Sequence, residues 1–390
     1  MPAFGSTHGD NVMPFQDLSL IDCEALQKDA LESWKRSGSK ILGYVCSAVP
    51  VELIYGAGIA PVRMIGREIP IAAANSKYTN YSCYFARSIY ELADRGEYGL
   101  LDGTVFTYSC DCLRGLVDKW QYDFDQLYFY FLVRPQNSDV PGALDFFVKE
   151  LHDFQRSLED FVGKKMTQEA LQESIRLYNS NRELLSKING ARGERITGSA
   201  ALELTFAAML LPPHEGNRLL QKAWSDLPSA SLTFRGPRLA LVGTALSNAR
   251  LPALIENCGG MVVADDLCTG YRAWSGSVQP EGDLLRNLAA HYLHGADAGS
   301  QCPVMSTKGR LPARLNSLLS FKEQGRIDGV VFATQRYCDP QQLDNQYLFS
   351  ALGDRNIPAL KLEVEESVDA SQTQTRIEAF LELAEQRRNN

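Results

Sequence analysis

The sequence predicts an α/β protein with two Rossmann-like parallel-sheet domains, a helical middle segment, and a ligand cleft between the two domains. Three observations lead to this fold class. Apolar strand candidates alternate with helix candidates before residue 140, helical spacing dominates from there to 235, and the alternation returns at 236. Strands that alternate with helices typically pair in parallel. The chain has 390 residues, too many for one compact core.

The N-terminal half begins with an expected helical extension (1–38) and continues as an α/β domain (39–139). Pro50 and Gly56 frame a short helix, because proline favours a helix start and glycine a helix end. Apolar residues at helical spacing predict a second helix over 82–94. The β-rich apolar runs that predict strands are 41–45, 60–65, 103–108 and 127–133.

The middle region, residues 140–235, is predicted to be helical. Apolar residues recur at steps of three and four over 144–162, which is typical of an amphipathic helix. Thr167 can cap a second helix. A third helix candidate covers 198–211 and stops at the following pair of prolines.

The C-terminal segment, residues 236–390, returns to the α/β pattern. Two helices are predicted, one over 252–257 with a Gly-Gly terminator and one over 374–385 that closes the chain. The strand candidates are 238–242, 261–264, 329–333 and 359–364.

Composition narrows the class of protein. Apolar residues make up 45% and charged residues 22%, which is ordinary for a soluble globular chain. The net charge of −8 argues against a nucleic-acid binder. No apolar run approaches the ~20 residues that span a bilayer, and the polar N-terminus lacks a secretory pattern. We therefore expect a cytoplasmic protein that binds neither nucleic acid nor membrane.

The nine cysteines carry the strongest chemical signal, although no Cys-x-x-Cys pair is present. Four of them come after strand candidates, at the carboxyl end where ligands of open α/β sheets bind. A fifth opens a helix, where amide donors favour a thiolate, and a sixth precedes proline in a Gly/Ala/Ser-rich loop. Zinc ligands usually come in close pairs, so dispersed thiolates favour an iron–sulfur cluster. The six candidates are Cys46, Cys83, Cys110, Cys268, Cys302 and Cys338.

The other three cysteines are expected to be dispensable. Cys23 and Cys258 lie within helix-like patterns and are interpreted as structural, and Cys112 follows Cys110 by two residues and is expected to turn away. The competing interpretation for all nine is that of small buried hydrophobic residues, which is common for free cysteine.

Other motifs are weaker. The turn after the strand at 238–242 lacks the G-x-G-x-x-G spacing, and no G-K-[S/T] occurs, so no dinucleotide fingerprint or P-loop is present. Asp265-Asp266 and the pair His291 and His294 are alternative metal ligands. Glu52 suits either acid–base chemistry or a charge at a helix N-terminus.

Several motifs along the chain, most of them around the candidate cysteines, together resemble those of one known family. They are residues 43–54 with Ala57-Gly58, Cys83-Tyr84-Phe85-Ala86-Arg87-Ser88, Cys110-Asp111, Asp265-Asp266-Leu267-Cys268-Thr269-Gly270, Cys302-Pro303, Tyr337-Cys338-Asp339 after Asp328-Gly329-Val330-Val331, and 374–380. Through these motifs the chain resembles the 2-hydroxyacyl-CoA dehydratase / benzoyl-CoA reductase family over about residues 36–385. A departure is Thr244-Ala245-Leu246, where relatives often carry a Cys-Pro or Ser-Pro turn.

This resemblance implies two alternative cofactors. Ordinary dehydratase subunits of the family hold one [4Fe–4S] cluster with three cysteines, which correspond here to Cys83, Cys110 and Cys338. The double-cubane cluster branch holds an [8Fe–9S] cluster with six, and all six motif positions are cysteine here. The second cubane would then take Cys46, Cys268 and Cys302. The chain is most similar to that branch.

The resemblance implies an iron–sulfur enzyme that receives low-potential electrons from an ATP-hydrolysing iron–sulfur activator and passes them to a small molecule. It also implies a homodimer or a heterodimer with a homologous subunit. Two alternatives stay open. One is a dehydratase or benzoyl-CoA reductase type subunit that acts on an acyl-CoA by radical chemistry. The other is a non-catalytic electron carrier or cluster scaffold. The identity of the substrate is not predicted.

Overall fold

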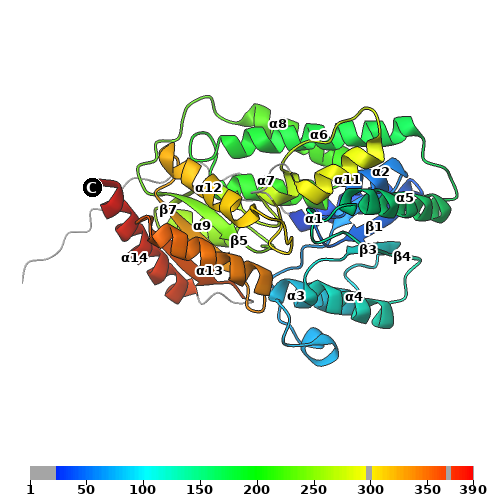
Figure 1. Cartoon of the computed structure of the whole chain (residues 1–390), viewed down its shortest axis with the longest axis horizontal. Coiled ribbons are helices and arrows are strands. Elements are labelled where there is room, and N and C mark those ends of the chain that lie inside the picture. The colour runs from blue at the N-terminus through cyan, green and yellow to red at the C-terminus, as the bar shows by residue number, and fades with distance from the viewer. Residues whose placement is uncertain (1–22, 296–300, 366–369, 390) are drawn as a thin grey trace, which may run out of the picture.

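The computed structural model describes residues 23–295, 301–365 and 370–389. Two four-stranded sheets, both parallel throughout, form the centre of the fold (Figure 1). The expected α/β class with two Rossmann-like parallel-sheet domains is therefore confirmed. The strand orders, β2-β1-β3-β4 and β6-β5-β7-β8, are the same arrangement repeated in the second half of the chain.

The first sheet is formed by strands that are largely buried, because helices cover it. Its strands are β1 (Ile41–Tyr44), β2 (Ala60–Arg63), β3 (Gly103–Thr107) and β4 (Tyr128–Leu132). The helical elements between them are α2 (Val51–Gly56), η1 (Ala74–Tyr78), α3 (Tyr84–Asp94) and α4 (Asp111–Asp123). Helix α1 (Cys23–Arg36) packs through Leu31 against β1 and β2 of this sheet. Residues 1–22 of the expected extension lie outside the described residues.

The second sheet repeats the pattern. Its strands are β5 (Arg238–Gly243), β6 (Met261–Asp266), β7 (Gly329–Thr334) and β8 (Ala359–Glu363). The helices of this part are α9 (Arg250–Asn257), α10 (Tyr271–Trp274), α11 (Leu284–His294), α12 (Arg310–Glu323), α13 (Asp339–Gly353) and α14 (Ala370–Asn389). Among the helices in the described ranges, none is long and apolar enough to cross a membrane.

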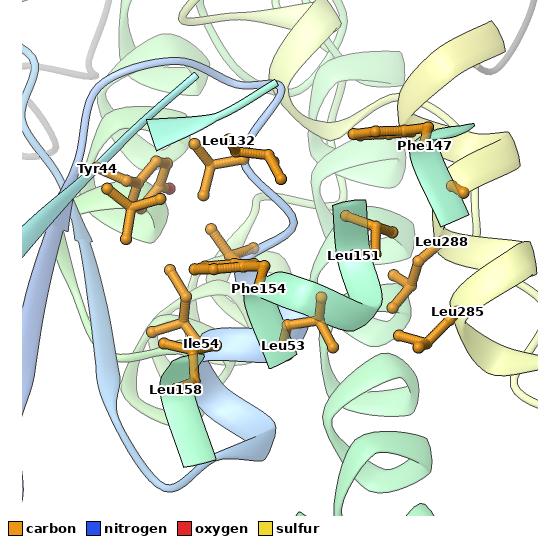
Figure 2. Close-up of a cluster of buried hydrophobic side chains, with 14 of the residues drawn as sticks. Tyr44, Leu53, Ile54, Leu132, Phe147, Leu151, Phe154, Leu158, Leu285 and Leu288 are labelled. Carbon is orange, nitrogen blue, oxygen red and sulfur yellow. The ribbon is translucent and has the colours of Figure 1, made fainter. Parts of the chain in front are cut away.

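Long helices from the middle of the chain join the two sheets along the top of Figure 1. They are α5 (Ala143–Val162), α6 (Gln168–Gly190), α7 (Gly198–Leu210) and α8 (Pro213–Asp226). Helix α5 packs against α11 from the C-terminal half. Figure 2 shows Phe154 and Leu158 of α5 near Ile54 of α2, with Leu288 of α11 at the other end of the same core. This apolar contact holds the two halves together.

The strand expectations agree with the structure to within two residues, because these strands are short apolar runs. Helix α8 was missed, since the proline pair was interpreted as a stop. Pro213 instead opens α8, at a position where the missing amide hydrogen has no intrahelical partner anyway. Helices α4 and α13 were also missed, although both begin immediately after a candidate cysteine.

Candidate metal centre

The first sheet delivers two candidate cysteines to one edge. Cys46 follows β1, and Cys110 is the N-cap of α4, which comes after β3. Strands β1 and β3 are neighbours, and the chain order reverses between them. In open parallel sheets the crevice at such a switch point binds ligands. Cys83 joins the same region as the N-cap of α3.

The second sheet presents its own cysteines to the same junction. Cys268 follows β6, and Cys338 is the N-cap of α13 after β7. Gln335 connects the two halves beside them. Its side chain accepts a hydrogen bond from the Phe85 amide at 2.8 Å and donates one to the Ala245 carbonyl at 2.8 Å. The carboxyl ends of both sheets therefore face one another.

One group of sulfurs, the Cys83 set, comprises Cys83, Cys110 and Cys338. Hydrogen bonding to Cys112, together with burial, raises the pKa of Cys83 and Cys110 well above the ordinary value. Burial raises the pKa of Cys338 to about 12. Each of the three cysteines is also the N-cap of a helix. Helix N-termini favour negative charge.

The expectation that Cys112 turns away is wrong. Its sulfur hydrogen-bonds with those of Cys110 and Cys83, and this lowers the pKa of Cys112. In its thiol form the same sulfur donates to the Tyr337 carbonyl at 3.2 Å, directly before Cys338. The physical reason is local. Cys112 lies in the first turn of α4, and helical side chains point back toward the N-terminus, where Cys110 stands.

The second group of sulfurs, the Cys46 set, comprises Cys46, Cys268 and Cys302. Burial, followed by repulsion from Cys268, raises the pKa of Cys46 to about 11, and Arg134 opposes this rise. Burial acts to raise the pKa of Cys268, but Arg63 and Arg272, with hydrogen bonds from Arg63 and Ser47, together outweigh it, so that the pKa of Cys268 is lowered. The Arg63 guanidinium lies 3.3 Å from the Cys268 sulfur.

A small cavity of about 60 Å³ adjoins the Cys46 set. Cys46, Cys302, Arg134 and Gln301 are among the residues that line it. The two sets are close to one another, since Cys302 and Cys268 both contribute to the raised pKa of Cys338, after burial. Each set therefore includes cysteines from both halves of the chain.

The donor chemistry of the candidate residues, cysteine thiols alone, fits an iron–sulfur group, whose irons are held by thiolates. Within the described ranges, no three His, Cys, Asp or Glu side chains converge closely enough to hold one metal ion. Arg134 is buried with two nitrogens that have no hydrogen-bond partner, as expected beside an anionic group.

The weaker candidates have structural partners. Asp265 pairs with Arg192 at 2.7 Å, and Asp266 pairs with Arg272 at 2.8 Å, so these carboxylates are not a cation site. Glu52 is fully buried, not at an exposed helix end. Its partners are Arg182 at 2.5 Å and the Tyr292 hydroxyl at 2.7 Å.

Cys258 is the C-cap of α9, directly before β6 starts. It therefore lies at the amino end of the second sheet, the edge opposite the candidate centre. His291 lines the small cavity, and burial lowers its pKa to about 4, so the ring is neutral at pH 7. His294 ends α11, where its carbonyl accepts a hydrogen bond from the Gln301 side chain.

The family model described as 2-hydroxyglutaryl-CoA dehydratase, D-component, matches residues 46–383. The chain belongs to this family. The matched range contains all six candidate cysteines, and the resemblance indicated by the motifs is confirmed.

Relatives of the family with established names cover almost the whole chain. A benzoyl-CoA reductase subunit of Thauera aromatica is 28% identical over 88% of this chain and 92% of the relative. The beta subunit of lactoyl-CoA dehydratase of Anaerotignum propionicum is 24% identical over 93% and 97%. The beta subunit of (R)-2-hydroxyglutaryl-CoA dehydratase of Acidaminococcus fermentans is 23% identical over 92% and 96%. Because the relatives are reductase and dehydratase subunits, the expectation of an enzyme is confirmed.

Sequence reasoning missed Arg63, Arg134 and the inward position of Cys112. Arg63 ends β2, and Arg134 follows β4 by two residues. The strand-end rule that selected the cysteines applies equally to these arginines and could have found both. Cys112 was detectable from its place in the first turn of a helix that begins at Asp111.

Proposed function

We propose that this protein is an iron–sulfur reductase that carries an [8Fe–9S] double-cubane cluster and passes low-potential electrons to a small-molecule substrate in the cytoplasm. The observation that supports it most is the meeting of the Cys83 set and the Cys46 set at one junction of the two sheets. Six thiolates in two groups of three suit two linked cubanes, and they exceed the three that a single-cubane subunit needs.

The residues have distinct roles in this proposal. Cys83, Cys110 and Cys338 would hold one cubane, and Cys46, Cys268 and Cys302 the other. The cluster would supply one-electron transfer at low potential. Helices α3, α4 and α13 place their N-terminal amides at the first three sulfurs and stabilise negative charge there. Cys46 and Cys83 are buried and the other four cysteines are half-buried, which limits access of water to the centre.

The proposed partners follow from energetics and from the family. The sequence has no P-loop, and very low-potential electrons need an energy source. An ATP-hydrolysing iron–sulfur activator would supply both electrons and driving force. The relatives are named as subunits, which supports a dimer of this chain or a heterodimer with a homologous subunit.

Iron and sulfide analysis of anaerobically purified protein, combined with EPR, tests the proposal. We expect about eight irons per chain in the double-cubane case. Turnover of a small-molecule substrate should require reduced activator and ATP. Absence of iron and sulfide would contradict the proposal. A cluster that never turns over with reduced activator and ATP would instead favour an electron carrier or scaffold.

The alternative function is that of an acyl-CoA dehydratase or reductase subunit with one [4Fe–4S] cluster. The names of the relatives favour it, as does a cavity of about 550 Å³ lined by residues that include Tyr84, Ser247 and Gln335. Cavities of this size hold sizeable ligands, and Tyr84 directly follows Cys83. About four irons per chain and turnover of an acyl-CoA would establish this alternative.

A further inference from the structure

Two buried arginines beside the Cys46 set have no carboxylate partner among the described residues. Arg63 is 1% exposed, and its donors reach the Val45 carbonyl, the Met209 sulfur, and the carbonyl and sulfur of Cys268. Arg134 is 5% exposed and makes one hydrogen bond, of 3.3 Å, to the Tyr292 carbonyl. Its Nε and one terminal nitrogen are buried without a partner.

Most other buried arginines of the described chain pair with a carboxylate, as Arg182 does with Glu52 and Arg192 with Asp265. An isolated buried cation costs several kcal/mol or more unless an anion compensates it. The positions of Arg63 and Arg134 therefore point to negative charge at the Cys46 set that the protein's own carboxylates do not provide.

Sulfur is the acceptor that the geometry offers. Arg63 already donates to the Cys268 sulfur at 3.3 Å. Arg134 lines the small cavity together with Cys46 and Cys302, and two of its buried nitrogens have no hydrogen-bond partner. Gln301 also lines this cavity, and its side-chain oxygen is buried without a partner.

The Cys83 set has a different environment. Its three cysteines are the N-caps of α3, α4 and α13, so that backbone amides of helix starts lie beside them. Arg87 lies close by in the chain, but its donors are taken by the Ser82 carbonyl and the Asn75 side chain. The two sets thus differ in electrostatics although the sheets that carry them have the same topology.

We propose, on the basis of the iron–sulfur function above, that Arg134 and Arg63 donate hydrogen bonds to sulfur atoms of the cluster half held by Cys46, Cys268 and Cys302. These two cations make that half the first to be reduced. One electron from the activator adds one negative charge there, the half held by the Cys83 set stays oxidised, and no proton is required. Arg63 and Arg134 are positioning residues: they stabilise negative charge on this half of the cluster and do not coordinate iron.

The physical basis is the low dielectric of the junction. Negative charge gained close to a fixed cation is stabilised far more in a protein interior than in water. Hydrogen bonds to cluster sulfurs are a known determinant of reduction potential. Reducing equivalents would then collect beside the small cavity at Arg134, which makes this cavity the expected place of substrate reduction.

The test is an EPR-monitored redox titration of anaerobically purified wild type, Arg134→Gln, Arg134→Lys and the matched control Arg114→Gln. The control removes the same charge at an exposed position four residues after Cys110. Iron and sulfide are counted first, so that absence of a cluster in the wild type is recognised as failure of the proposed function itself. Two further variants, Cys110→Ser and Cys268→Ser, isolate the two halves.

We expect Arg134→Gln to retain iron. The equilibrium constant of its first reduction step should fall at least tenfold, which is a shift of about 59 mV to lower potential for one electron. Arg134→Lys should lie between it and the wild type, and Arg114→Gln should match the wild type. Cys110→Ser retains the half held by the Cys46 set, and Cys268→Ser retains the half held by the Cys83 set. The first of these halves should be easier to reduce than the second.

Three results would overturn the inference. They are an unchanged potential in iron-replete Arg134→Gln, an equal shift in Arg114→Gln, and the reverse order of the two isolated halves. If Arg134→Gln loses iron, retention of the cluster in Arg134→Lys supports the need for charge. Loss of all iron from both Arg134 variants, rather than of about half, would contradict a role confined to the Cys46 set.

Discussion

Single Cys→Ser substitutions should divide the candidate cysteines into two groups of three. Loss of one member of the Cys83 set should remove the cubane that it holds and leave the other in place. The same holds for the Cys46 set. Because each set of three is proposed to hold one cubane, we expect each of the six variants to retain about four of about eight irons.

The assay is iron and sulfide analysis under anaerobic conditions, with EPR to identify what remains. Cys258→Ser is the matched control, since it makes the same chemical change at the opposite edge of the second sheet. Cys112 is the sharpest case. Its sulfur contacts those of Cys83 and Cys110, yet it is not in the proposed ligand set, so Cys112→Ser should retain about eight irons.

Two outcomes would refute this reasoning. Loss of iron in the Cys112 or Cys258 variant, with the Cys46 and Cys302 variants unaffected, would overturn the ligand assignment. Complete loss of iron in all six variants would be consistent with the assignment of the six ligands. It would contradict the division into two cubanes that assemble separately.

Two further predictions concern the framework around the centre. Arg182→Met leaves the buried Glu52 carboxylate with Tyr292 alone, so the free energy of unfolding in urea should fall by about 3–5 kcal/mol. Lys187→Met, which breaks an exposed pair on the same helix, should cost under about 1 kcal/mol, and equal costs would contradict the argument. Gln335→Ala should lower stability by about 1–3 kcal/mol and speed iron loss to a chelator, because it leaves two buried backbone groups unpaired. Unchanged chelation kinetics would show that this link does not hold the halves together at the centre.

The sheets could be predicted from the sequence because their strands are short, apolar and buried. The strand-end positions of Cys46, Cys110, Cys268 and Cys338 followed from the same pattern, since parallel strands bring their carboxyl ends to one edge. Arg63 and Arg134 occupy equivalent places, but a lone arginine at a strand end is usually solvated, so its residue type alone does not indicate a site. Only tertiary packing shows that both are buried without a carboxylate.

Neither sheet can build either set of sulfurs alone. Cys338 comes from the second half and joins Cys83 and Cys110, whereas Cys46 comes from the first half and joins Cys268 and Cys302. Arg63 crosses the same boundary, since it extends from β2 to Cys268. Any group held by these sulfurs therefore fastens the two halves to each other, and its binding energy adds to the energy of docking. The apolar contact of α5 with α11 and the polar bridge at Gln335 bring the edges together beforehand. The fold thus explains how six cysteines that are far apart in the chain can form one centre, and why disturbing the contact between the halves should loosen iron even where no ligand is changed.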